Sequence, residues 1–265
     1  MASPILVTGG TGTLGRHVVP LLREAGRDVR VLSRRGREPA DGIEYVTGDL
    51  LKDEGIEAAV AGSEIVVHLA GGAKGDDEAT RNLVRASARA EVKHLVFISV
   101  IGADRVPLAW LKTQLDAERA VIDSGVPWTI QRAAQFHDLV LKVVRSMARL
   151  PVVPNPGGLR FQPVDARDVA VRIAGLALGE PAGRVPDLAG PEVYGMGELV
   201  RGYLRARGKR RPTMPVRIPG KAGRAYRAGD NLALEGADHG TRTWEDFLHE
   251  EVGAGPARPA TSASA

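Results

Sequence analysis

Short apolar runs alternate with longer amphipathic stretches over the first half of the chain. The runs are continuous and do not alternate with polar residues, which is typical of strands buried on both faces of a parallel sheet. The predicted strands are Ile5–Thr8, Val29–Ser33, Glu44–Val46, Ile65–Leu69, Leu95–Ser99 and Trp128–Gln131. The predicted helices are Leu14–Ala25, Glu78–Ala90 and Leu108–Ser124. This alternation favours an α/β fold built on a doubly wound parallel sheet.

The pattern changes after residue 150. Proline and glycine predict a loop over residues 151–158, followed by a strand over Arg160–Val164. A helix is predicted over Asp168–Leu178, with Asp165 or Asp168 near its start. We therefore expect a larger lobe over residues 1–150, to which segment 160–180 returns, and a smaller C-terminal substrate lobe over residues 151–252. Residues 253–265, rich in Gly, Pro, Ala and Ser, are expected to form a disordered tail.

Composition excludes several classes of protein. The 265 residues are 43% hydrophobic and 26% charged, which is ordinary globular usage and enough chain to bury a core. Cysteine is absent, which excludes a disulfide scaffold, a cysteine-ligated zinc site and a thiolate nucleophile. The first apolar segment is too short for a signal peptide, and no run approaches the ~18 apolar residues of a membrane span. We expect a cytoplasmic protein, and no His/Asp/Glu spacing predicts a metal site.

A glycine-rich segment, Thr8–Gly15, follows the first predicted strand and opens the first predicted helix. Glycines at 9, 12 and 15 suit a dinucleotide: the first permits a tight turn, the second a close approach of the diphosphate, and the third close packing of helix and strand. Amides around Thr13 and Leu14 would face the phosphates at a helix N-terminus. The expected cofactor contacts in this segment are Gly9, Thr11, Gly12, Thr13, Leu14 and Gly15.

The end of the second predicted strand indicates which cofactor is bound. An NAD site usually has an acid here, whereas this chain has Ser33, Arg34 and Arg35. Two guanidinium groups and a hydroxyl suit a 2′-phosphate. We therefore predict NADP, the alternative being that both arginines simply lie on the surface of an arginine-rich chain.

Further motifs carry a family resemblance. They are Gly48–Leu50, Leu69–Gly72, Phe97–Ala103, Ala134–Asp138 and Pro163–Ala170. With the glycine loop, they resemble the short-chain dehydrogenase/reductase superfamily, in particular its atypical, NmrA-like NAD(P)-binding branch, over roughly residues 3 to 250. The resemblance implies a Rossmann sheet.

The resemblance also implies a role for several residues. Asp49 and Leu50 would lie against the adenine, and Ala70 and Gly71 beside the adenosine ribose. Ser99 would lie near the nicotinamide, as a cofactor and substrate contact. Asp168 would have a structural role, because its carboxylate can cap backbone amides.

Carbonyl reductases of this superfamily use a Tyr-x-x-x-Lys dyad on the helix after the fifth strand. Aligning Leu115–Arg119 with the usual continuation puts Trp110 at the tyrosine position and Gln114 at the lysine position. An indole cannot donate a proton usefully and an amide carries no charge, so ketone reduction should suffer by the roughly 10²–10⁴-fold that a general acid supplies. The helix predicts instead hydride transfer to an electron-poor acceptor, a rebuilt proton donor, or no catalysis.

Few residues could rebuild that donor. His137 follows the sixth predicted strand and titrates near neutral pH, so a catalytic role and a structural role at a helix start both stay open. Ser99 is a candidate hydrogen-bond donor to the substrate. Lys112 should face away from the site, and His68 should be a packing residue. The expected lining of the substrate cleft is Ser99, Trp110, Phe136 and His137.

The leading hypothesis is an NADPH-dependent oxidoreductase for a small apolar or aromatic acceptor, such as a quinone or conjugated carbonyl. The alternatives are an NADP-binding redox sensor that signals to a regulated protein partner, and a non-redox isomerase or cyclase. Ten basic residues and no acid lie between Arg201 and Arg227, although the chain's net charge is only +4. We expect this segment to be a solvated or homo-oligomer surface rather than a nucleic-acid site, because no DNA-binding motif accompanies it.

Overall fold

A parallel sheet forms the centre of the computed structural model, which describes residues 3–39, 42–72, 74–233 and 235–252. Within these residues nine strands join the sheet in the order β13-β10-β6-β5-β4-β1-β2-β3, with β9 also paired to β6, and every pairing is parallel. The strands are β1 (Ile5–Thr8), β2 (Val29–Ser33), β3 (Ile43–Thr47), β4 (Ile65–His68), β5 (His94–Val100), β6 (Trp128–Ala133), β9 (Gly183–Arg184), β10 (Leu188–Ala189) and β13 (Asp238–His239). The predicted doubly wound parallel sheet is confirmed.

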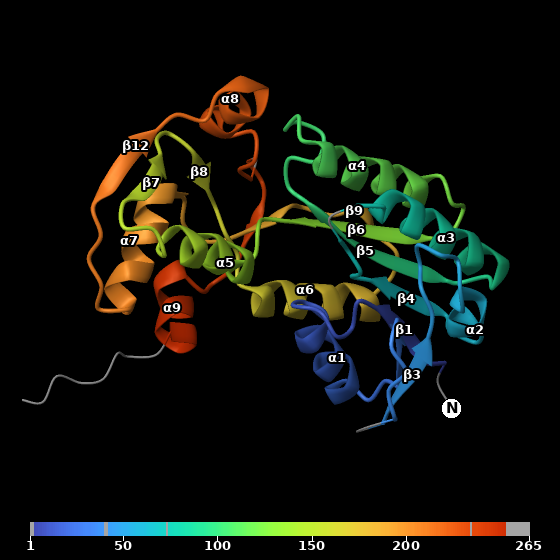
Figure 1. Ribbon diagram of the computed structural model, residues 1–265. Helices are drawn as coiled ribbons and strands as arrows, with labels where there is room; N and C mark the ends of the chain where they lie inside the picture. Colours follow the sequence, from blue (N-terminus) through green and yellow to red (C-terminus); the bar gives the residue numbers. More distant parts are fainter. Residues whose placement is uncertain (1–2, 40–41, 73, 234, 253–265) are drawn as a thin grey trace, which may run out of the picture.

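Helices cover both faces of this sheet (Figure 1). On one face, α1 (Gly15–Glu24) and α6 (Ala166–Leu178) pack on a core that includes Ile5 and Val7. On the other, α2 (Ile56–Val60), α3 (Asp76–Arg89) and α4 (Ala109–Ile122) pack on a core that includes Leu6. The side chains of neighbouring residues in one strand thus point into the cores on opposite faces of the sheet, which explains why the strands are continuous apolar runs.

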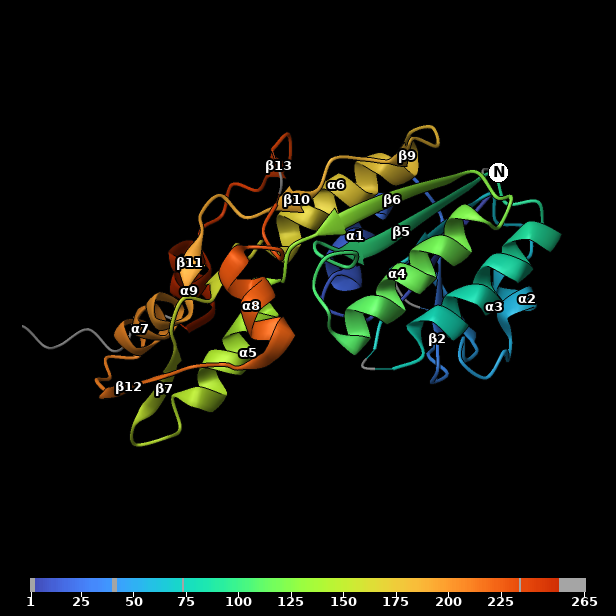
Figure 2. The ribbon, with the colours of Figure 1, turned by 90° about the horizontal axis from the view of Figure 1, so that it is seen from above.

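A second group of elements lies beside the sheet (Figures 1 and 2), and we call it the small lobe. Its helices are α5 (His137–Met147), α7 (Met196–Ala206), α8 (Gly220–Ala228) and α9 (Trp244–Val252). Its strands are β7 (Val153–Pro156) parallel to β12 (Thr213–Val216), and β8 (Arg160–Phe161) antiparallel to β11 (Tyr194–Gly195). Trp244, Phe247 and Leu199 belong to an apolar core that joins α5, α7 and α9.

The loop expected over residues 151–158 is wrong, because residues 153–156 form β7. Pro154 and Pro156 alternate with residues that have an N–H, and β7 pairs on one side only. Proline is tolerated on such an edge, where alternate N–H groups need no partner. The expected strand over Arg160–Val164 is shorter than predicted: β8 ends at Phe161, and Val164 makes an isolated bridge to Phe136.

The two acids proposed near the start of α6 have separate roles. Asp165 is the N-cap and accepts the Arg167 N–H at 2.8 Å. Asp168 accepts the N–H groups of Thr241 at 2.8 Å and Arg242 at 3.1 Å, in the segment before α9. Asp168 is therefore structural, as predicted, but it holds the amides of a distant segment.

The chain passes between the sheet and the small lobe more than once. α5 begins before residue 150 yet packs with α7 and α9, whereas α6, β10 and β13 come later and lie on the sheet. A division at residue 150 with a return over 160–180 stays a prediction. The tail proposed over residues 253–265 lies outside the described residues. Among the described residues, no helix is both long and apolar enough to span a membrane.

Candidate functional site

The glycine loop between β1 and α1 leaves no room for side chains at two of its positions. Gly9 has φ of +68°, and a Cβ there would lie 2.6 Å from the backbone nitrogen of Ala70. A Cβ on Gly15 would overlap the carbonyl oxygen of Gly9. Only glycine allows the backbones of β1, the residues after β4 and the start of α1 to approach this closely.

The same loop presents backbone donors at the carboxyl edge of the sheet. The N–H groups of Thr13 and Leu14 donate to no backbone carbonyl in the described part of the chain. Thr11 and Gly12 are exposed. Unpaired amides at the N-terminus of α1, aided by the helix dipole, suit a diphosphate. The loop therefore fits the phosphates of a dinucleotide.

The end of β2 carries free positive charge. Arg34 and Arg35 are exposed and form no ion pair with a described side chain, while the Arg35 N–H donates to Ser33 Oγ at 3.3 Å. Since β1 and β2 are parallel neighbours, both arginines lie at the same edge as the glycine loop. Their position suits a ribose phosphate.

The ends of β3 and β4 complete that edge. Asp49 Oδ1 accepts the Leu51 N–H at 3.0 Å, so its carboxylate also holds its own turn. Leu50 is buried in the core beneath α2 and α3, Ala70 is half-buried and Gly71 is exposed. Their positions are compatible with an adenosine on this edge, while their contact with it stays a prediction.

Ser99 near the end of β5 is 2% exposed, and its Oγ has no hydrogen-bond partner among the described residues. Buried hydroxyl groups are normally paired, and an exception in a native structure calls for an explanation. A group of a bound cofactor or acceptor would supply the missing partner. This orphaned atom is a further feature, after the free amides and the two arginines, that fits a bound ligand.

His137 is enclosed by the small lobe. Its side chain has no exposed surface, its ring centroid lies 5.1 Å from that of Phe247 and 5.7 Å from that of Trp244, and Nδ1 lies 3.9 Å from Asp165 Oδ2. Both ring nitrogens lack a hydrogen-bond partner among the described residues. The catalytic role of His137, its place in the cleft lining and its structural role all stay predictions. Phe136 is partly buried against the core of the sheet.

The two positions on α4 that the sequence alignment assigns to the dyad differ in their surroundings. Trp110, at the start of α4, is 36% exposed. Gln114 is buried, and its Nε2 donates to Asp76 Oδ2, while Asp76 Oδ1 accepts the Gly72 N–H at 2.7 Å. Burial raises the pKa of Asp76. Gln114 thus ties α4 to the loop after β4, and Lys112 is exposed, as predicted.

Comparison with known proteins agrees with this geometry. Residues 9–140 match a family described as NAD(P)H-binding. A (4-alkanoyl-5-oxo-2,5-dihydrofuran-3-yl)methyl phosphate reductase of Streptomyces griseus is 33% identical over 213 residues, which are 77% of this chain and 74% of that protein. The chain belongs to the NAD(P)H-binding family. The resemblance to atypical, NmrA-like short-chain dehydrogenase/reductases is confirmed.

Two further proteins are similar to this chain. An NAD(P)H azoreductase of Xenophilus azovorans is 29% identical over 213 residues, 77% of this chain and 74% of that protein. The structure of an NADPH-dependent quinone oxidoreductase of Escherichia coli, in complex with NADPH, matches with a TM-score of 0.75 at 20% identity, covering 93% of this chain and 99% of that one. At that identity the structure supports the fold alone.

The NAD(P)H-binding chain also has candidate residues that its sequence did not reveal. Both polar atoms of the Gln135 side chain and Oδ1 of Asn231 are buried without a partner among the described residues. Gln135 directly follows β6 and lies in the Ala134–Asp138 motif, which was the only signal available. No sequence motif marks Tyr226 in α8 or Asn231 just after it, because only the folded chain brings this segment to this end of the sheet.

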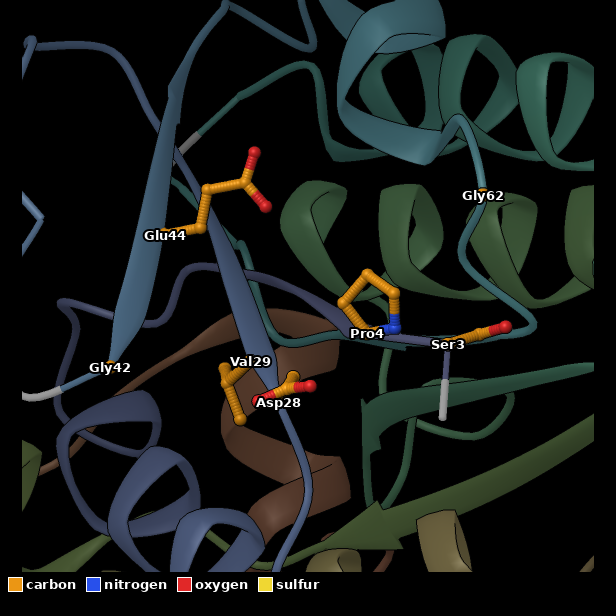
Figure 3. A pocket seen from close by; sticks show the side chains of 7 residues that line it. All are labelled: Ser3, Pro4, Asp28, Val29, Gly42, Glu44 and Gly62. Atoms are coloured by element: carbon orange, nitrogen blue, oxygen red, sulfur yellow. The ribbon is translucent and has the colours of Figure 1, made fainter. Parts of the chain in front are cut away.

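Two cavities lie away from the carboxyl edge of the sheet. One of about 480 Å³, shown in Figure 3, lies at the amino ends of β1, β2 and β3. Parallel α/β sheets bind ligands at the opposite, carboxyl edge, so this cavity does not mark the cofactor site. A second, of about 310 Å³, places Arg201 and Arg205 among Glu192, Glu198 and Glu245. Part of the basic segment therefore faces acids and is not a uniformly positive surface.

Proposed function

We propose that the protein is an NADPH-dependent oxidoreductase that transfers a hydride to a small apolar or aromatic acceptor, either a quinone or a conjugated carbonyl. The observation that carries this proposal is the contrast between the two halves of the site. The loop, the free amides and the orphaned Ser99 hydroxyl fit a dinucleotide, yet α4 offers Trp110 and Gln114 where the dyad would stand.

The chain's own groups would hold the cofactor at both ends. The amides of Thr13 and Leu14 would bind the diphosphate, and Arg34 and Arg35 would bind the 2′-phosphate, which favours NADPH over NADH. Ser99 Oγ would donate a hydrogen bond near the reacting centre. The reduced nicotinamide, when bound, supplies the hydride.

The missing dyad restricts the acceptor. Reduction of a simple ketone leaves a basic alkoxide that needs a proton donor, and neither an indole nor a glutamine amide can serve. Reduction of a quinone or conjugated carbonyl leaves a delocalised anion, which water can protonate. A site without a general acid therefore suits these acceptors best.

The names of the relatives support this acceptor class. One similar protein is a reductase of an unsaturated furanone and one is an azoreductase. Both names describe reduction of an unsaturated acceptor, which is the class that the altered helix favours.

Steady-state oxidation of NADPH by menadione, cyclohexenone and cyclohexanone tests the proposal. We expect turnover with the first two, little with cyclohexanone, and none in the Gly12→Asp variant, whose carboxylate would repel the phosphates. NADPH binding without turnover would contradict the oxidoreductase and favour a redox sensor. Rearrangement of a substrate with no net oxidation of NADPH would favour an isomerase or cyclase.

A further inference from the structure

The segment from α8 to Leu232 crosses from the small lobe to the end of β5. A Cβ on Gly102, in the loop after β5, would lie 2.9 Å from the carbonyl oxygen of Asp230 and 3.3 Å from Cα of Asn231. Arg105 in the same loop donates to the Leu232 carbonyl at 3.1 Å. Figures 1 and 2 both show α8 near the start of α4. The segment is thus held beside the strand that carries Ser99.

Tyr226 of α8 lies where this segment contacts both lobes. Its ring centroid is 5.5 Å from that of Phe161 on β8, and the ring also packs against an apolar cluster that includes Val106 in the loop before α4 and Leu111 in the first turn of α4. Val100, the residue after Ser99, packs on the same cluster. The ring of Tyr226 is therefore fixed between the end of β5, the start of α4 and the small lobe.

The hydroxyl of Tyr226 is available to a ligand. Within the described residues it forms no hydrogen bond, and it is not one of the fully buried polar atoms. Burial of the ring raises the pKa of Tyr226, so the phenol keeps its proton at neutral pH and acts as a donor. Asn231 within this segment and Ser99 on the adjoining strand also have a buried side-chain oxygen without a partner among the described residues, which fits a polar ligand at this end of the sheet.

We propose that Tyr226 is the acceptor-binding residue of this enzyme, and that its hydroxyl donates a hydrogen bond to the oxygen of a quinone or conjugated carbonyl. The inference rests on the oxidoreductase function proposed above. It places on α8 the phenol that α4 lacks at Trp110. Such a donor assists reduction because the hydrogen bond strengthens as negative charge develops on the acceptor oxygen.

The variant Tyr226→Phe tests this role, with Tyr203→Phe as a matched control. Tyr203 is also a partly buried tyrosine of the small lobe, but it packs in the core between α7 and α9. Removing a hydrogen bond to a developing anion should lower kcat/KM for the acceptor about 10- to 100-fold. The KM for NADPH should not change, and Tyr203→Phe should match the wild type.

The acceptor series separates an acceptor-binding role from a merely structural one. The developing oxygen anion of cyclohexenone is more basic than that of menadione and accepts a stronger hydrogen bond. Tyr226→Phe should therefore lose more activity with cyclohexenone than with menadione. An equal loss with both acceptors, or the same loss in Tyr203→Phe, would overturn the inference.

Calorimetric titration of menadione into the protein loaded with oxidised NADP measures acceptor binding without turnover. We expect Tyr226→Phe to bind menadione more weakly than the wild type. If the wild type reduces menadione and Tyr226→Phe equals it in both assays, the role of Tyr226 is overturned and the oxidoreductase function stands. If the wild type binds menadione but does not reduce it, the oxidoreductase function fails, and weaker binding by Tyr226→Phe still supports the contact. If the wild type binds no menadione, both fail.

Discussion

Nδ1 of His68 lies 2.6 Å from Oγ1 of Thr8, and its Nε2 lies 3.0 Å from Oγ1 of Thr80. The ring stacks on Phe97 with centroids 5.2 Å apart and is 1% exposed. His68 therefore joins β1, β4 and α3. Its partner Thr8 directly precedes the turn at Gly9, and both ring nitrogens have a hydrogen-bond partner, so His68 is a packing residue.

Burial lowers the pKa of His68 to about 4. The folded protein then binds fewer protons than the unfolded chain between pH 6.5 and 4, so stability is lost as the pH falls through this window. A shift of this size corresponds to about 3 kcal/mol. We expect His68→Gln to be less stable at pH 7 but to lose less stability on acidification, as measured by urea unfolding at several pH values. His239→Gln, at an exposed position, should keep the wild-type pH dependence; an identical profile in both variants would contradict the assignment.

Arg132 and Glu118 form a buried ion pair that fixes α4 on β6. The guanidinium bonds both carboxylate oxygens at 2.7 and 2.6 Å, and the two side chains are 3% and 5% exposed. Removing one partner of a buried pair typically costs about 3–5 kcal/mol. Glu118→Ala should therefore lower the urea midpoint strongly. Glu57→Ala, which breaks the exposed pair with Arg89, should change it little.

A double variant distinguishes the cost of losing the buried ion pair from a loss of packing. Glu118→Leu with Arg132→Met removes both charges and keeps side chains of similar volume, so it should recover most of the lost stability. Arg132 also pairs with Asp104 at 2.9 Å, so its guanidinium keeps one partner in Glu118→Ala. A double variant as unstable as Glu118→Ala would show that packing, and not the lost pairing of the guanidinium, sets the cost.

The sequence predicted the sheet well because its strands are buried on both faces and leave continuous apolar runs. The ends of β1 and β2 match the prediction residue for residue. The glycine loop could be placed for a similar reason, since its spacing reflects local backbone needs. β7 could not, because its prolines are typical of a loop and only pairing with β12, 60 residues later in the chain, makes it a strand.

The acceptor side of the site was less predictable for the same physical reason. His137 looked available because it follows a strand, but Trp244 and Phe247, more than 100 residues later, cover it. Tyr226 lies in a helix whose sequence shows no motif, and only the packing of α8 on the β5–α4 loop brings it to the site. Long-range packing of this kind has no local signal.

Asp76 links the loop after β4 to α4 and should support cofactor binding. Its carboxylate accepts the Gly72 N–H at 2.7 Å and the Gln114 amide. Asp76→Ala removes both bonds, so we expect the Kd for NADPH to rise about 10-fold, as measured by fluorescence titration. Asp77→Ala, whose carboxylate pairs with the exposed Arg81, should leave the Kd within twofold. Equal effects of the two variants would mean that the link to Gly72 does not shape the cofactor site.

Arg34 and Arg35 should set the preference for NADPH over NADH. Each guanidinium can donate charge-assisted hydrogen bonds to a 2′-phosphate, which NADH lacks. We expect Arg34→Ala with Arg35→Ala to lower kcat/KM for NADPH about 100-fold and to leave that for NADH nearly unchanged. Arg37→Ala, whose guanidinium lies 5.9 Å from the centre of the Tyr45 ring, is the control. A parallel loss with both cofactors would place the arginines outside the phosphate site.

The altered positions on α4 predict that ketone reduction can be restored. Trp110→Tyr with Gln114→Lys would supply a phenol and a nearby ammonium, which lowers the phenol pKa. The gain in cyclohexanone reduction should be only about 10-fold, below the 10²–10⁴-fold of an optimised general acid, because the new lysine would also face the Asp76 carboxylate that Gln114 now binds. Trp110→Phe with Gln114→Lys keeps the ring without the hydroxyl and should show no gain. If it gained as much as the tyrosine variant, the improvement would come from space left by the indole, and α4 would not be the site of the lost proton donor.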